Sequence, residues 1–131
     1  MEKIIELDSV RYLEAGEVAS LICMSSKSFS IGLADKGTCE GFFVREEDGA
    51  LRAYKNSCPH TGAPLNWTPN QFLTTSGRYV QCSIHGAMFK ADTGECFAGP
   101  CAGKFLKALR LIERNGMAYI ALPEIQKSPL K

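Results

Sequence analysis

The only two histidines of this 131-residue chain each follow a cysteine at short spacing. Cys58-Pro59-His60 presents one thiol and one imidazole, and Cys82-Ser83-Ile84-His85 presents a second pair. Deprotonated thiols and neutral imidazoles are both common ligands of transition metals in proteins. Two loops that each offer one thiol and one imidazole therefore predict a metal centre.

Zinc is one metal that two thiolates and two imidazoles can hold, in tetrahedral geometry. Zinc fingers, however, group Cys with Cys and His with His, whereas each motif here combines one Cys with one His. A redox-active dithiol is less favoured, because the chain has no C-x-x-C motif. The spacing therefore favours an iron–sulfur cluster and leaves zinc as the alternative.

The residues around these motifs resemble the Rieske iron–sulfur family. Residues 58–65, Cys-Pro-His-Thr-Gly-Ala-Pro-Leu, are similar to its first cluster-binding loop, and residues 82–89, Cys-Ser-Ile-His-Gly-Ala-Met-Phe, to its second. Gly99-Pro100 stands where the proline loop of the family usually covers the cluster. The resemblance extends from Phe42 to Leu122, with a longer connection between the two ligand loops than is usual.

The resemblance implies one Rieske-type [2Fe–2S] cluster, in which two Cys hold one iron and two His hold the other. Cys58 and Cys82 would bind the first iron, and His60 and His85 the second. No catalytic residue is implied. The residues that would shield the cysteine side of the cluster from water are Leu65, Ile84, Phe89 and Pro100.

The same resemblance implies an all-β Rieske (ISP-like) fold, in which an antiparallel β-sandwich or barrel base carries an inserted cluster-binding subdomain. Short apolar or alternating runs between frequent turn residues are typical of such sheets, and no sustained 3.6-residue apolar period predicts a helix. We expect one domain over residues 1–131. Its parts would be the base (1–55 and 98–122), the cluster-binding subdomain (56–97) and a tail (123–131).

The local pattern also predicts individual elements. The Asn115-Gly116 pair is the strongest hairpin signal, because both residues readily adopt the positive φ of a two-residue turn. Other turns are predicted at Glu14-Ala15-Gly16, Lys36-Gly37, Asp48-Gly49 and Asp92-Thr93-Gly94. The predicted strands are Ile4–Leu7, Val18–Met24, Ser28–Ala34, Gly41–Arg45, Leu51–Tyr54, Tyr79–Cys82, Met88–Ala91, Leu106–Glu113 and Met117–Leu122.

Charge and hydropathy exclude some classes of partner. The formal net charge of +1 gives no overall basic field of the kind that binds nucleic acid. No stretch approaches the roughly 18 apolar residues that a bilayer-spanning helix requires. The beginning of the chain, Met1–Glu6, shows neither a signal-peptide pattern nor a twin-arginine motif. We therefore expect a cytoplasmic protein that does not bind a membrane.

Four cysteines lie outside the two motifs. Free thiols are expected in a reducing compartment, and Cys23 is expected to be buried, since it lies in an apolar run. Cys96 and Cys101 flank Ala98-Gly99-Pro100 and are expected near each other and near the metal centre. Free thiols are favoured for this pair, and a bridge between them stays open.

The loop residues also bear on the reduction potential. Some quinol-oxidising Rieske proteins brace their loops with a disulfide at positions where this chain has Ala63 and Ser83. They also place hydroxyl groups near the sulfur atoms at positions where it has Ala87 and Phe89. Hydrogen bonds to sulfur stabilise the reduced cluster, so their absence lowers the potential. We expect a value in the lower part of the range of about −150 to +300 mV.

These features predict a Rieske-type ferredoxin, a monomeric one-electron carrier between a flavin-dependent reductase and a terminal oxygenase or hydroxylase. We expect no enzyme activity, because no further His remains for a mononuclear iron site. The chain also has no G-x-G-x-x-G motif for a flavin or nicotinamide. The alternative is a Rieske-like small subunit of a multi-subunit oxidoreductase, of the nitrite reductase small-subunit type. A zinc-stabilised binding module is a third possibility.

Overall fold

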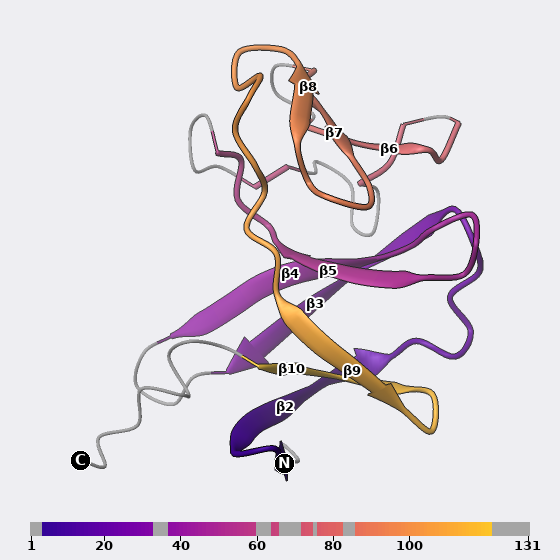
Figure 1. The fold of residues 1–131 in the computed structure, drawn as a ribbon, viewed down its shortest axis with the longest axis vertical. Coiled ribbons are helices and arrows are strands. Elements are labelled where there is room, and N and C mark those ends of the chain that lie inside the picture. The colour runs from indigo at the N-terminus through magenta and orange to yellow at the C-terminus, as the bar shows by residue number, and fades with distance from the viewer. Residues whose placement is uncertain are drawn as a thin grey trace.

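The structure, a computed structural model, is built from antiparallel strands in three sheets (Figure 1). No helix occurs in the part of the chain that it describes, and hence none long and apolar enough to span a membrane. The all-β, antiparallel fold expected from the sequence is confirmed. The described residues are 4–32, 37–59, 64–65, 72–74, 76–82 and 86–121.

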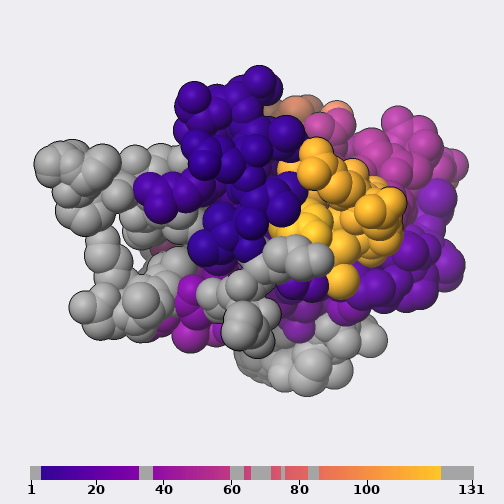
Figure 2. All heavy atoms as spheres, turned by 90° about the horizontal axis from the view of Figure 1, so that it is seen from below, coloured from indigo at the N-terminus to yellow at the C-terminus, as the bar shows by residue number. Residues whose placement is uncertain are grey.

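Two sheets form the lower part of the molecule in Figure 1, and a third lies above them. Strand β2 (Val10–Glu17) pairs with β10 (Met117–Ala121), so residues near both ends of the chain lie side by side, indigo next to yellow in Figure 2. The first sheet has the order β1 (Ile4–Leu7), β2 (Val10–Glu17), β10 (Met117–Ala121), β9 (Arg110–Arg114). The second has the order β3 (Ser25–Gly32), β4 (Thr38–Arg45), β5 (Leu51–Lys55). The third has the order β6 (Tyr79–Gln81), β7 (Met88–Lys90), β8 (Cys96–Ala98).

Strand β4 separates two hydrophobic cores. Its residues 41–44 are all buried, and successive side chains of a strand point to opposite faces. Phe43 therefore packs in a base core, which also contains Leu13, Val18, Phe29, Ile31, Cys39, Ala53, Leu109, Ala118 and Ile120. Phe42 and Val44 pack in an upper core together with Tyr54, Cys58, Leu65, Phe72, Val80, Cys82, Ala87, Phe89, Cys96, Cys101 and Leu106. The second sheet thus separates the base core from the upper core.

Two-residue turns with positive φ form the hairpins of the first sheet. Asn115 (φ 55°) and Gly116 (φ 79°) join β9 to β10, as the Asn-Gly pair predicted. Asp8 (φ 51°) and Ser9 (φ 66°) join β1 to β2 in the same way. This second turn was not predicted, because no glycine marks it.

The region around β2 differs from its prediction. Residues 14–16 were expected to form a turn, but they lie inside β2, where Gly16 is opposite Ala118. The predicted strand Val18–Met24 is wrong: these residues form the connection from β2 to β3, with Ile22 72% exposed and Cys23 exposed instead of buried. Strand β8 was not predicted, and the strand expected from Leu106 begins only at Arg110. Long-range pairing with β10 has overridden the local turn propensity of β2.

Candidate metal centre

Cys58 lies in the loop after β5, and hydrogen bonds of Asn56 fix this loop at both sides. The Asn56 backbone N–H donates to the Glu40 carbonyl oxygen at 2.9 Å. The Asn56 side-chain oxygen accepts a hydrogen bond from the Leu65 N–H at 2.7 Å, so Asn56 and Leu65 lie next to each other. The Cys58 side chain points into the upper core and is only 2% exposed.

Cys82 comes directly after β6 and forms hydrogen bonds with two residues just before β7. Its N–H donates to the Ala87 carbonyl oxygen at 2.8 Å, and the Gly86 N–H donates to the Cys82 carbonyl oxygen at 3.0 Å. Gly86 has a φ of 70°, which residues with a side chain rarely adopt. These contacts hold Cys82 in the upper core, where it is 1% exposed.

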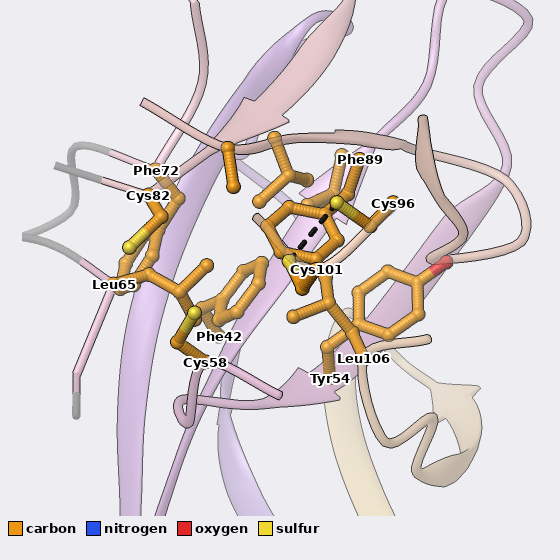
Figure 3. Close-up of a cluster of buried hydrophobic side chains, with 13 residues drawn as sticks. Phe42, Tyr54, Cys58, Leu65, Phe72, Cys82, Phe89, Cys96, Cys101 and Leu106 are labelled. Atoms are coloured by element: carbon orange, nitrogen blue, oxygen red, sulfur yellow. Dashed lines mark hydrogen bonds between the residues drawn. The ribbon is translucent and has the colours of Figure 1, made fainter. Parts of the chain in front are cut away.

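The two thiols belong to one core although they come from different loops. Figure 3 shows their sulfur atoms on the same side of the upper core, near Leu65. Phe89, on β7, packs in the same core, and both Leu65 and Phe89 are fully buried. Neither Cys58 nor Cys82 is in a disulfide. The structure therefore brings together the two thiols that the sequence motifs predicted as ligands.

The remaining predicted site residues fall into two groups. Pro100 is exposed at the surface. Its neighbour Gly99 packs closely on the second ligand loop, since a Cβ atom at Gly99 would lie 2.8 Å from the Ala87 Cα atom. The predicted residues that lie outside the described part of the chain are His60, Ile84 and His85. The role of each site residue stays a prediction.

The residues present fit an iron–sulfur cluster. Such clusters are held by Cys thiolates, and in Rieske centres two His replace two of the four Cys. Cys58 and Cys82 supply two buried, unbridged thiols, and each belongs to a sequence motif that also contains a His. Among the described residues, no three His, Cys, Asp or Glu side chains form a competing metal site.

Comparison with known families identifies the family of this chain. A family model of the Rieske [2Fe–2S] domain matches residues 10–120. The chain therefore belongs to the Rieske [2Fe–2S] family, and its cofactor is a Rieske-type [2Fe–2S] cluster.

Solved structures with the same fold include two ferredoxins. The ferredoxin of carbazole 1,9a-dioxygenase from Nocardioides aromaticivorans IC177 has a TM-score of 0.62 and 21% identity, over 84% of this chain and 96% of that chain. The ferredoxin of Sphingomonas yanoikuyae B1 has a TM-score of 0.63 and 23% identity, over 86% of this chain and 99% of that chain. At such identities the likeness establishes the fold.

A relative of a different kind is much longer than this chain. The cholesterol 7-desaturase of Caenorhabditis elegans is 33% identical over 88 residues, which are 59% of this chain and 19% of the desaturase. The chain thus spans less than a fifth of the length of that relative. The same domain occurs both in small carriers and as part of large enzymes.

Tyr54 connects the base with the third sheet, a role that was not predicted from the sequence. It is buried in the upper core, and its hydroxyl donates a hydrogen bond to the Ala91 carbonyl oxygen, just after β7, at 2.7 Å. Burial raises the pKa of Tyr54 to about 12. An aromatic residue in a strand carries no signal of its distant partner, so only the structure reveals this link.

Replacing Tyr54 by Phe is expected to lower the free energy of unfolding by about 1 kcal/mol near neutral pH, the usual net value of one hydrogen bond. The folded-state pKa of Tyr54, about 12, lies above that of an unfolded tyrosine, about 10. The stabilising preference for the neutral phenol is therefore fully present below about pH 10 and is lost as the pH rises toward 12. Urea unfolding of both proteins at pH 7 and at about pH 11 measures this difference. If the two proteins differed in their free energy of unfolding by the same amount at both pH values, the raised pKa of Tyr54 in the folded state would be contradicted.

Proposed function

We propose that this chain is a Rieske-type ferredoxin, a carrier of single electrons between a flavin-dependent reductase and a terminal oxygenase or hydroxylase. When bound, the [2Fe–2S] cluster supplies the one-electron redox chemistry. The observation that carries the proposal is that both histidines of the 131 residues belong to the two Cys-His motifs. Within these 131 residues, no further His is therefore left for the mononuclear iron that a terminal oxygenase requires.

Each site residue has a role in this proposal. Cys58 and Cys82 hold one iron, and His60 and His85 hold the other. The histidine side is the exit point for the electron. Apolar side chains exclude water from the cysteine side of the cluster, namely those of Leu65, Ile84, Phe89 and Pro100. Leu65 and Phe89 do so from fully buried positions.

Two ferredoxins that align with this chain over nearly their whole length support the proposal of a small carrier. One of them is the ferredoxin of carbazole 1,9a-dioxygenase, which supports an oxygenase as the electron acceptor. We further propose that the protein is monomeric and cytoplasmic, binds its partners transiently, and has no catalytic residue. The proposed division into a base (1–55 and 98–122), a cluster-binding subdomain (56–97) and a tail (123–131) follows from the sequence motifs.

The purified protein tests this function directly. We expect a reddish-brown protein with about two irons and two sulfides per chain, whose reduced form has an average g value below that of all-Cys clusters. It should accept electrons from a flavin-dependent reductase and sustain turnover of a ring-hydroxylating oxygenase, with no product when the oxygenase is left out. A colourless protein with one zinc per chain would contradict the cluster. Stoichiometric co-purification with a large redox enzyme would favour the small-subunit alternative.

The reduction potential is expected in the lower part of the Rieske range of about −150 to +300 mV. Ala87 and Phe89 are buried in the same upper core as Cys82 and carry no hydroxyl group that could donate to sulfur. Fewer such hydrogen bonds leave the more negative, reduced cluster less stable. A redox titration followed by visible absorption measures the potential, and a value near +300 mV would show that other donors replace them.

A further inference from the structure

Two cysteines that the proposed function does not use lie in contact beside the metal centre. Cys96 begins β8, Cys101 follows five residues later, and their sulfur atoms are 3.0 Å apart (Figure 3). The Cys101 S–H donates to the Cys96 sulfur, and the Cys96 S–H donates to the Ala98 carbonyl oxygen at 3.2 Å. Both residues are 1% exposed, and both are free thiols in this structure.

Backbone hydrogen bonds hold the two sulfur atoms in this position. The Cys96 N–H donates to the Lys104 carbonyl oxygen at 2.8 Å, and the Gly103 N–H donates back to the Cys96 carbonyl oxygen at 2.9 Å. The Lys104 N–H donates to the Cys101 carbonyl oxygen, also at 2.9 Å. Residues 96–104 therefore form a closed loop whose shape already brings the two thiols together.

The pair also lies next to a proposed iron ligand. Burial is the main cause that raises the pKa of Cys101 to about 12, followed by the neighbouring Cys96 thiol and then by Cys58. Figure 3 shows Cys101 between Cys58 and Cys96 in the upper core. The four proposed ligands of the cluster do not include Cys96 or Cys101, so both remain available for other chemistry.

We propose that Cys96 and Cys101 are a reversible disulfide-forming site at the edge of the metal centre. A disulfide has a sulfur–sulfur distance of about 2.05 Å, so bond formation requires an approach of about 1 Å from the observed contact. The site differs in position from the bridge of the quinol-oxidising proteins, since this chain has Ala63 and Ser83 where those cysteines would stand.

The oxidant in this reaction is a small-molecule disulfide such as oxidised glutathione. One cysteine thiolate attacks a sulfur of the oxidant and releases one glutathione, which leaves a mixed disulfide on the protein. The second cysteine then displaces the other glutathione and forms the Cys96–Cys101 bond. Two electrons pass from the cysteine pair to the oxidant, and the two thiol protons end on the two released glutathiones. Residues 102–104 of the loop are exposed, and local opening of the loop admits the oxidant.

The closed bond would fix the loop that carries Gly99 and Pro100. Gly99 packs against the Cα atom of Ala87 in the second ligand loop, as its 2.8 Å virtual Cβ distance shows. A bridge across residues 96–101 therefore limits how far this loop can lift from the metal centre. The dithiol and disulfide forms of the pair would therefore differ in the mobility of the loop that carries Gly99 and Pro100.

A mass-spectrometric titration of the intact holoprotein tests the proposal. The protein is held in glutathione buffers of increasing oxidised fraction until the composition is constant, then alkylated and digested with trypsin. Cleavage after Lys90 and Lys104 gives peptide 91–104, which contains Cys96 and Cys101 and no other cysteine. We expect this peptide to lose two hydrogen atoms and to escape alkylation. The same peptide, synthesised and titrated alone, is the reference for an unpositioned pair.

The folded protein is expected to form the disulfide at an oxidised fraction of glutathione at least about tenfold lower than the synthetic peptide needs, because the fold holds the reacting atoms in contact. Cys39→Ser should leave this closure unchanged, whereas Cys96→Ser and Cys101→Ser should each abolish it. Disulfide formation that needs the same oxidised fraction as in the free peptide would overturn the proposal, and so would stable glutathione adducts on the two cysteines. The result is independent of the ferredoxin function, since peptide 91–104 contains none of the proposed iron ligands.

Discussion

Replacing Cys58 by Ala is expected to leave the purified protein with less than about a tenth of the wild-type iron content. Cys58 supplies one of the two buried thiols that we propose as ligands of the same iron. Loss of one thiolate leaves that iron incompletely coordinated, and a cluster that depends on every ligand is then not retained. Iron and acid-labile sulfide per chain, together with the visible absorption spectrum, measure the effect.

Cys39→Ala is the matched control for this experiment. Cys39 is also buried, but its side chain packs in the base core, on the other side of the second sheet. The same atoms are removed, so the loss of packing is similar, about 1 kcal/mol for one small buried group. Circular dichroism checks that both variants fold. Equal iron content in the two variants would show that Cys58 is not a ligand.

Features set by neighbouring residues could be predicted from the sequence. Asn115-Gly116 forms its hairpin because its conformation depends on two adjacent residues only. The Cys-His motifs are recognisable for the same reason, since the residues of each lie next to one another along the chain. The structure adds that Cys58 and Cys82 enter one core, and it adds Leu65 and Phe89 as fully buried neighbours.

Features set by distant residues could not be predicted in this way. The Glu14-Ala15-Gly16 segment has the composition of a turn, yet it lies in β2 because β10 supplies the opposing strand. A Cβ atom at Gly16 would lie 3.7 Å from the Phe43 ring, an ordinary packing distance, so this strand position does not require a glycine. Residues 18–24 pair with no strand in the described part of the chain, and Ile22 in this run is 72% exposed. The contact of Tyr54 with Ala91 is of the same long-range kind.

Replacing Phe42 by Ala is expected to lower the free energy of unfolding by about 3–5 kcal/mol, the usual loss for a fully buried Phe. Phe42 lies on the upper face of β4 and stacks on Phe72, with ring centroids 4.2 Å and planes 8° apart. The Phe72 carbonyl oxygen accepts a hydrogen bond from the N–H of Gln81, the residue before Cys82, at 2.9 Å. Phe42 therefore joins the base to the segment that positions Cys82. Urea unfolding measures the loss of stability.

Phe43→Ala is the matched control, because Phe43 is the next residue of the same strand and is equally buried. Its ring lies on the opposite face, in the base core, with its centroid 4.5 Å from that of Phe29. The same atoms are removed, so a similar loss of stability is expected. Only Phe42→Ala should also accelerate iron release to a chelator, by about tenfold or more, because its cavity opens within the core that holds Cys58 and Cys82.

The comparison of these two variants separates local from global loss of the cluster. If iron escaped only from the unfolded chain, variants of equal stability would release it at equal rates, whichever core had been weakened. A faster release from Phe42→Ala at equal stability requires opening of the upper core alone while the base core stays intact. Successive side chains of β4 point to opposite faces, so adjacent residues of one strand would then have different functions. Phe43 would stabilise the base, and Phe42 would retain the metal centre.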